Sequence, residues 1–251
     1  SYWANNPDKL LIVGNHDALN ASSGVDWTDQ PSQQTMYLRY FQPYLNSTNI
    51  NIEANKTYWY KEYSAKKMML IGLNVMLVTS AGQTETMSFL ESCLTKAIAN
   101  DESVIIAVHW AFNQSTVISS NWTAFNPENG HGEITSYTNT FETSIMQKVS
   151  DYIDNGLKFV CYICGHSHQD ILSISTGIKN KQLFITNTCT YIDGYNDIPR
   201  ISGTTSVTTC NLLSYKDGFI SITRFGGDTT VNNRPRKFLK IKTDGTIIID
   251  D

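Results

Sequence analysis

Two kinds of hydrophobic pattern divide the chain into an α/β part and a β-rich part. Residues 86–100 carry apolar side chains at helical spacing and lead directly into a short apolar run at residues 104–108. The same order, an amphipathic helix and then a buried strand, recurs at residues 141–155 and 159–164, with Gly156 as the helix stop. Alternating helices and strands of this kind predict a sheet with helices packed outside it.

Further short apolar or alternating runs predict additional elements around these units. The earliest run, residues 9–13, ends at Gly14 and indicates a buried strand that continues into a loop. An aromatic-rich stretch at residues 36–45 is typical of a helix that stops near Pro43. The other strands predicted in this part are residues 58–63, 68–73 and 75–79.

Towards the C-terminus the pattern changes to short strands separated by turns, two of which contain Asp-Gly. The strands predicted there are residues 183–186, 210–214, 219–224, 238–242 and 246–249. Such a meander either completes a second sheet or forms a small appended module. We therefore predict a main domain at residues 1–200 and a β-rich tail at residues 201–251.

Size and charge narrow the class of protein. With 251 residues, of which 41% are hydrophobic and 17% charged, the chain can bury one large core with or without an appendage. The net charge of -4 creates no general basic field, so nucleic acid and anionic membranes are not expected partners. No run approaches the roughly 20 apolar residues of a membrane-spanning helix. A phosphate-bearing substrate would need local cations, such as bound metal ions, and the cellular compartment is left open.

The cysteines do not form a pattern typical of a metal or disulfide site. The five are widely scattered, and only Cys161 and Cys164 form a CxxC pair. This pair lies in the apolar run at residues 158–164, and no second CxxC or neighbouring CxxH completes a tetrahedral zinc site. We predict two buried core cysteines.

Histidines provide the clearest chemical signal. Four of the five follow predicted strands: His16 in Gly-Asn-His-Asp, His109 in Val-His-Trp, and His166 with His168 in Gly-His-Ser-His. Because ligands collect at the carboxyl ends of strands in open α/β sheets, three strands would bring imidazoles to one edge. Taken singly, a histidine after a strand is more often a hydrogen-bonded cap. Together the four predict a convergent metal site, since imidazole is a common ligand of zinc, iron and manganese.

The three blocks at residues 14–17, His109 and residues 165–168 resemble the calcineurin-like metallophosphoesterases. The signature of that family is DxH, GD, GNH(D/E), H and GHxH, and this chain has the last three blocks in order. The resemblance extends over roughly residues 9–190. It implies a metallophosphoesterase-like αββα sandwich, with two mixed β-sheets flanked by helices, incomplete at its N-terminus and followed here by the β-rich tail.

By that resemblance, four residues bind a dinuclear centre of Mn, Zn or Fe. Asn15, His109 and His166 would bind the second ion, and His168 would bind the first. Neutral amide and imidazole ligands leave a divalent ion strongly electrophilic. Two ions about 3.5 to 4 Å apart can hold a phosphate group and lower the pKa of a bridging water. The full-length enzyme would contain two ions, and this chain one or none.

The resemblance also implies two catalytic residues. His16 would protonate the leaving alkoxide or stabilise charge on the phosphoryl group, and Asp17 would orient its imidazole. A carboxylate beside an imidazole raises the pKa of the imidazole, so that it can serve as an acid.

The chain departs from the family at its start. The DxH and GD blocks supply two ligands of the first ion and the bridging carboxylate, but only 13 residues precede Gly14 and they contain neither block. The sequence is expected to be a piece of a longer enzyme, one half of a split enzyme, or a degenerate relative, with the first explanation favoured. In each case we expect the isolated chain to bind at most one ion well and to hydrolyse phosphoesters poorly or not at all.

The leading function is a metal-dependent phosphoesterase that hydrolyses phosphomonoesters or phosphodiesters with metal-activated hydroxide. Its partners would be a small phosphate ester or a nucleotide, and the missing N-terminal segment or a larger assembly. The alternative is a non-catalytic binding or structural module on a degenerate scaffold. A zinc peptidase is disfavoured because the sequence has no HExxH motif.

Overall fold

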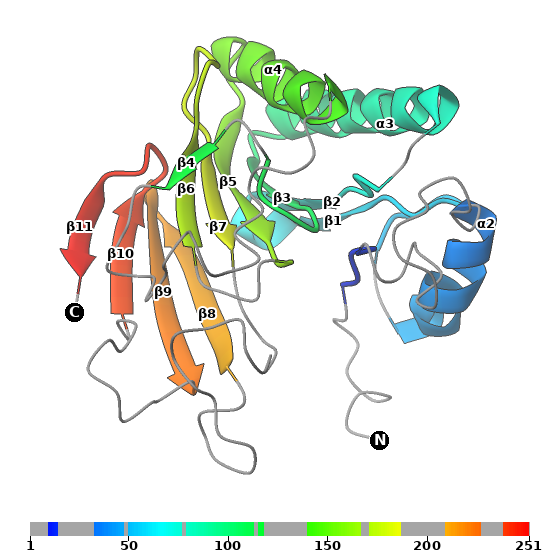
Figure 1. Cartoon of the computed structure of the whole chain (residues 1–251), viewed down its shortest axis with the longest axis horizontal. Coiled ribbons are helices and arrows are strands. Elements are labelled where there is room, and N and C mark those ends of the chain that lie inside the picture. Colours follow the sequence, from blue (N-terminus) through cyan, green and yellow to red (C-terminus); the bar gives the residue numbers. More distant parts are fainter. Residues whose placement is uncertain are drawn as a thin grey trace. The chain divides into compact units, whose positions relative to one another are not determined.

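The structure, a computed structural model, describes residues 10–14, 33–47, 50–76, 79–112, 115–117, 140–166, 171–186, 209–226 and 238–250 (Figure 1). The chain divides into two compact units. The first comprises Ser1–His109 with Asp151–Lys158, and the second comprises Trp110–Ser150 with Phe159–Asp251. The domain boundary expected between residues 200 and 201 lies outside the described residues and stays a prediction.

A β-hairpin followed by a helical crossover builds the first unit. Strands β1 (Trp59–Tyr63) and β2 (Met68–Gly72) pair antiparallel around the short 3-10 turn η4 (Ser64–Lys66). Strand β3 (Ser103–Ala107) pairs parallel with β2. A parallel pair needs a long connection, and helix α3 (Ser80–Ala99) supplies it. The predicted order of helix and then strand is confirmed here.

Helix α3 packs against β2 and β3 through its apolar side chains. Leu90 and Leu94 are completely buried on the packed face. The helix begins six residues before the predicted start at residue 86, because the Thr79 hydroxyl accepts a hydrogen bond from the Gly82 amide at 3.2 Å. This contact satisfies one of the free amides of the first turn and fixes the start of the helix.

The strand predicted at residues 75–79 is wrong. Val75 and Met76 lie in a turn, which the buried Asn74 side chain holds together. Its Oδ1 accepts a hydrogen bond from the Met76 amide at 2.9 Å, and its Nδ2 donates to the Thr57 hydroxyl at 2.9 Å. A side chain that bonds the backbone two residues on favours a turn over a strand.

An irregular helical stretch precedes the sheet strands. It runs through α2 (Gln33–Met36), a π-helical turn η2 (Tyr37–Phe41) and a 3-10 segment η3 (Gln42–Ser47). The helical conformation predicted at residues 36–45 is confirmed. Pro43, however, lies inside η3 instead of ending the helix. Proline is tolerated there because the first turn of a helical segment leaves its amide without a partner.

The second unit contains a mixed group of strands in the order β5-β7-β6-β4. Strand β5 (Lys158–Cys164) pairs parallel with β7 (Leu183–Thr186). Strand β6 (Ile171–Ser175) pairs antiparallel with β7 and with β4 (Ser115–Val117). Strands β5 and β7 were predicted, but β7 was expected in the C-terminal meander, whereas it pairs with β5 and β6. Strands β6 and β4 were not predicted.

Helix α4 (Thr140–Asp154) is joined to this group of strands by the buried Gln182. The Gln182 amide donates to the Met146 carbonyl at 2.8 Å, and its oxygen accepts from the Tyr162 hydroxyl at 2.8 Å. The helix is followed by Gly156 in a left-handed conformation, with φ of +95°, as the sequence predicted.

Both cysteines of the CxxC pair are buried and unbonded in β5. Burial raises the pKa of the Cys161 thiol and the Cys164 thiol well above the usual range. Thiols of this kind are inert core residues, which confirms the sequence prediction.

The C-terminal strands form the predicted antiparallel meander. Asp217 and Gly218 both have positive φ, +52° and +81°, in the tight turn between the first two strands. Residues that alternate along the two central strands are completely or almost completely buried, so the sheet has one buried face. The strands, in the order β11-β10-β9-β8, are β8 (Thr209–Lys216), β9 (Phe219–Gly226), β10 (Phe238–Lys242) and β11 (Ile247–Asp250).

The chain is therefore a mixed α/β protein with two sheets, which is consistent with the predicted sandwich. Among the described helices, none combines the length and the apolar character needed to cross a membrane.

Candidate metal centre

The backbone of Gly14 packs against the imidazole of His109. His109 follows the carboxyl end of β3 by two residues and is partly exposed, whereas Gly14 is buried. A Cβ placed on Gly14 would lie 2.7 Å from Cε1 of His109 and 2.9 Å from its Nδ1. Only glycine allows so close an approach. The first residue of the Gly-Asn-His-Asp block therefore lies against His109, which follows β3.

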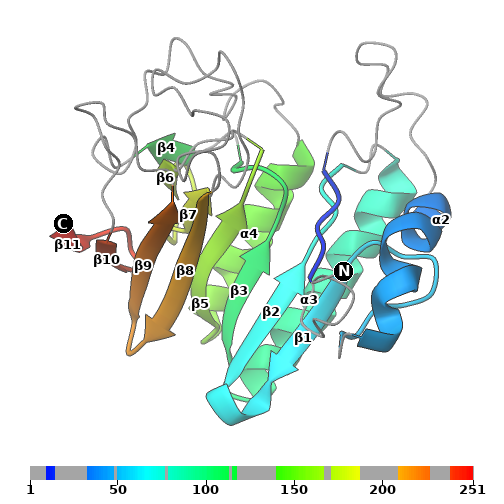
Figure 2. The ribbon, with the colours of Figure 1, turned by 90° about the horizontal axis from the view of Figure 1, so that it is seen from below.

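Trp59, in strand β1, holds the segment that contains Gly14 against the strands of the first unit. Its indole Nε1 donates a hydrogen bond to the Leu11 carbonyl at 2.7 Å, and its ring is completely buried. Figure 2 shows this segment, residues 10–14, in dark blue beside the strands of the first unit. The segment has no strand pairing, so the strand predicted at residues 9–13 is wrong for its described part. One side-chain hydrogen bond replaces the sheet contacts that were expected.

Gly72 in turn makes room for Trp59. The two residues are direct partners across the β1–β2 pair. A Cβ on Gly72 would lie 2.2 Å from Cε2 of the Trp59 ring. The indole thus lies across the backbone of Gly72, where a side chain of any size would displace it. Gly72 and Trp59 together place Leu11, three residues before Gly14.

His166 lies in a conformation that histidine rarely adopts. It follows β5 by two residues, is partly exposed, and has a φ of +64°. For a residue with a side chain, this left-handed conformation costs about 1–2 kcal/mol. Strain of this size is typical of functional positions, where the direction of a side chain matters more than backbone energy.

A tryptophan and a buried carboxylate support the His166 ring. The ring of Trp110 lies 5.4 Å from it, centroid to centroid, in an edge-on arrangement with an interplanar angle of 67°. The Trp110 indole donates a hydrogen bond to Oε1 of Glu142 at 2.6 Å, and Glu142 is only 2% exposed. The buried carboxylate therefore holds the tryptophan that packs on the histidine. It also contributes, after burial and Cys161, to the raised pKa of Cys164.

The sequence motifs did not single out Glu142, and Trp110 entered only as the last residue of Val-His-Trp. A signal for Glu142 was present, because it lies on the apolar face of its helix, three residues before Ile145 and four before Met146. A carboxylate on a buried helical face must find a partner, and here that partner lies beside the Val-His block.

The remaining predicted site residues, Asn15, His16, Asp17 and His168, lie outside the described residues. Within the described ranges, no group of three or more histidine, cysteine or acidic residues could hold a metal ion. The structure thus brings Gly14 to His109 and Trp110 to His166.

Two observations fit His109 and His166, each within its own unit, as ligands of divalent metal ions. Both described imidazoles are partly exposed, so their nitrogens are not sealed in an apolar core. Both also follow the carboxyl ends of strands that have a parallel partner, β3 beside β2 and β5 beside β7. Neutral imidazole nitrogens are suitable donors for zinc, manganese and iron.

No protein-family model matches the sequence, and no curated protein does either. Among solved structures, a crystal structure of a dimetal phosphatase from Danio rerio is similar, with a TM-score of 0.41 and 12% sequence identity. The similarity covers 74% of this chain and 60% of that protein, so the chain spans less than two thirds of its length.

Proposed function

We propose that this chain carries part of the metal centre of a phosphoesterase that hydrolyses phosphomonoesters or phosphodiesters. The observation that supports this most is the contact between the Gly14 backbone and the His109 imidazole. Gly14 opens the Gly-Asn-His-Asp block, and Asn15 is the next residue. The contact therefore joins two of the three blocks on which the resemblance to metallophosphoesterases rests.

The proposed ligands of one ion are the Asn15 amide oxygen and the imidazoles of His109 and His166. His168 is the proposed ligand of a neighbouring ion. Divalent ions at such a site would supply Lewis acidity and would lower the pKa of bound water to near neutral. The protein contributes the direction of each donor, and Trp110 with Glu142 provides that direction for His166.

His16 and Asp17 have proton-transfer roles in this proposal. His16 donates a proton to the oxygen of the leaving group, and the Asp17 carboxylate keeps the imidazole oriented and charged. Since the sequence offers only His168 to the first ion, we expect one bound ion and slow hydrolysis from this chain alone.

Metal stoichiometry and turnover test the proposal together. The purified chain is loaded with Mn²⁺, Zn²⁺ or Fe²⁺, its bound metal is measured by mass spectrometry, and hydrolysis of p-nitrophenyl phosphate and bis-p-nitrophenyl phosphate is followed. We expect about one ion per chain, with affinity lowered at least about tenfold in His109→Ala and in His166→Ala. His131→Ala serves as the matched control, because His131 is not among the proposed ligands.

Two results would contradict the proposal in different ways. A folded chain that binds no metal would favour the non-catalytic module. Two tightly held ions with fast turnover would show that the chain supplies ligands beyond the four named here.

A further inference from the structure

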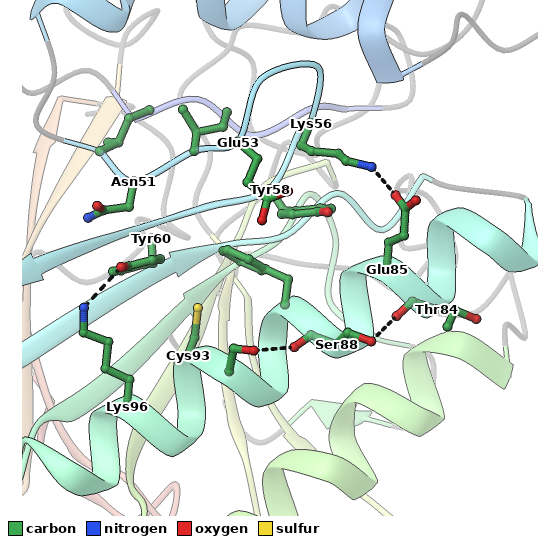
Figure 3. Close-up of a pocket in the computed structure, with 14 residues that line it drawn as sticks. Asn51, Glu53, Lys56, Tyr58, Tyr60, Thr84, Glu85, Ser88, Cys93 and Lys96 are labelled. Carbon is green, nitrogen blue, oxygen red and sulfur yellow. Dashed lines mark hydrogen bonds and ion pairs between the residues drawn. The ribbon is translucent and has the colours of Figure 1, made fainter.

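The first unit contains a cavity of about 820 Å³ between the segment before β1 and helix α3 (Figure 3). This volume lies within the range of about 300–1,000 Å³ that is usual for small-molecule sites. Tyr58 and Tyr60 line it from one side and Phe89 from the helix. Because side chains alternate along a strand, these tyrosines lie on the opposite face of β1 from Trp59. The cavity is thus separate from the contact of Trp59 with Leu11, and it does not depend on the proposed function.

Aromatic rings form one wall of the cavity. The rings of Tyr58 and Phe89 lie 4.5 Å apart at 34°, and those of Tyr60 and Phe89 lie 6.2 Å apart at 42°. The wall already carries one intramolecular cation, since the Lys96 ammonium lies 4.9 Å from the centre of the Tyr60 ring. Aromatic faces attract cations through their quadrupole, so the wall suits a positively charged organic group.

The two lysines that line the cavity are both paired. Lys56 forms an ion pair with Glu85, and Lys96 forms one with Glu62 at 2.8 Å. Glu53 also lines the cavity, and its carboxylate has no hydrogen bond or ion pair with any described residue. The lining itself holds two carboxylates, Glu53 and Glu85, and two ammonium groups, both of which are already paired. An anionic ligand would therefore find no unpaired cation in the described lining, whereas a cationic ligand would find the Glu53 carboxylate.

Tyr58 adds a hydroxyl group to the lining of the cavity. The residue as a whole is 3% exposed. Figure 3 shows the Glu53 side chain pointing towards Tyr58. Burial, followed by the carboxylates of Glu53 and Glu85, raises the pKa of Tyr58 to about 12, so the hydroxyl remains protonated at neutral pH. A protonated tyrosine hydroxyl can accept a hydrogen bond from a ligand group in the cavity.

We propose that this cavity binds an organic monocation, namely a primary ammonium group joined to an aromatic body. The ammonium group lies at the Glu53 carboxylate and donates a hydrogen bond to the Tyr58 hydroxyl. The aromatic body packs against Phe89. The charge pairs with the one carboxylate of the described lining that has no ion pair, and the Tyr58 hydroxyl adds a hydrogen-bond acceptor beside it.

Three probes of similar size and different charge test the proposal by titration calorimetry at low ionic strength. They are phenethylammonium, 2-phenylethanol and 3-phenylpropanoate. We expect phenethylammonium to bind up to about fivefold more tightly than the alcohol, since an exposed charge pair contributes up to about 1 kcal/mol. The propanoate should bind more weakly than either. No binding of phenethylammonium, or equal binding of all three probes, would overturn the proposal.

Variants then locate the binding site. Glu53→Gln should weaken binding of the cation about fivefold and leave binding of the alcohol unchanged. Phe89→Leu should weaken both probes, because it removes the ring but keeps an apolar side chain. The matched charge control is Asp217→Asn, in the exposed β8–β9 turn of the second unit, where asparagine suits the positive φ. Equal losses in Glu53→Gln and Asp217→Asn would show a general charge effect and sink the assignment. Circular dichroism of each variant confirms that it is folded.

Discussion

The two described histidines of the candidate metal centre are supported in opposite ways. His109 depends on two glycines that leave space. The Gly14 backbone lies against its ring, and Gly72 makes room for Trp59, whose hydrogen bond to Leu11 positions the segment that contains Gly14. His166 is held by added groups, namely the Trp110 ring and the buried Glu142 carboxylate, on a strained backbone. Adding side-chain atoms at the glycines should therefore disturb His109. Removing atoms or charge from the groups around His166 should disturb that histidine.

The largest effect is expected from Gly72→Ala. The new Cβ would lie 2.2 Å from the buried Trp59 ring, which cannot move away without disturbing its hydrogen bond to Leu11. Overpacking at such a site should lower the free energy of unfolding by about 3 kcal/mol, measured by urea denaturation. Gly177→Ala is the control, because its Cβ meets nothing within 4 Å and it costs only the strain of its positive φ, about 1 kcal/mol. Equal losses in the two variants would contradict the steric role of Gly72.

Glu142 tests the support of His166. In Glu142→Ala the buried Trp110 indole loses its acceptor and a cavity forms, so stability should fall by about 2 kcal/mol. Glu142→Gln keeps an oxygen that can accept the same hydrogen bond, and it should cost less than about 1 kcal/mol. Thermal unfolding monitored by tryptophan fluorescence compares the two. If glutamine is as damaging as alanine, the charge and not the hydrogen bond holds Trp110.

Gly14→Ala separates metal binding from stability. The added Cβ would contact the end of a partly exposed imidazole, which can move aside, so unfolding should change by less than about 1 kcal/mol. The displaced imidazole should nevertheless bind a divalent ion about tenfold more weakly, measured by competition with a metal indicator. Unchanged metal affinity would show that His109 does not bind metal from its present position.

The smallest change in stability is expected from His166→Gly. The informative result is whether stability rises or falls. Glycine adopts a φ of +64° without strain, so the gain of about 1 kcal/mol is offset in part by the lost contact with Trp110. Stability should stay equal or rise slightly, whereas metal binding falls. A clear loss of stability, measured by urea denaturation, would show that the histidine is a structural residue.

Much of the fold was predictable because it depends on local patterns. The apolar spacing along α3 and α4, the Asp-Gly turn before β9 and the continuous apolar run of β5 each carry their own signal in neighbouring residues. The errors occurred where buried polar side chains interrupt an apolar pattern. Asn74 forms a turn inside an apolar run, and buried serines such as Ser173 and Ser175 hide the pattern of strand β6.

The sequence by itself determined which residues are candidates for the chemistry. It places imidazoles after strands and puts Gly14 at the head of the Gly-Asn-His-Asp block, because the order of strand and loop along the chain is local information. Only the tertiary structure decided how two of these histidines are held. The contacts of Gly14 with His109, of Trp59 with Leu11 and of Glu142 with Trp110 join residues 32 to 95 positions apart, as the numbering itself shows. No local pattern encodes such pairs, because they form only when separate elements pack together.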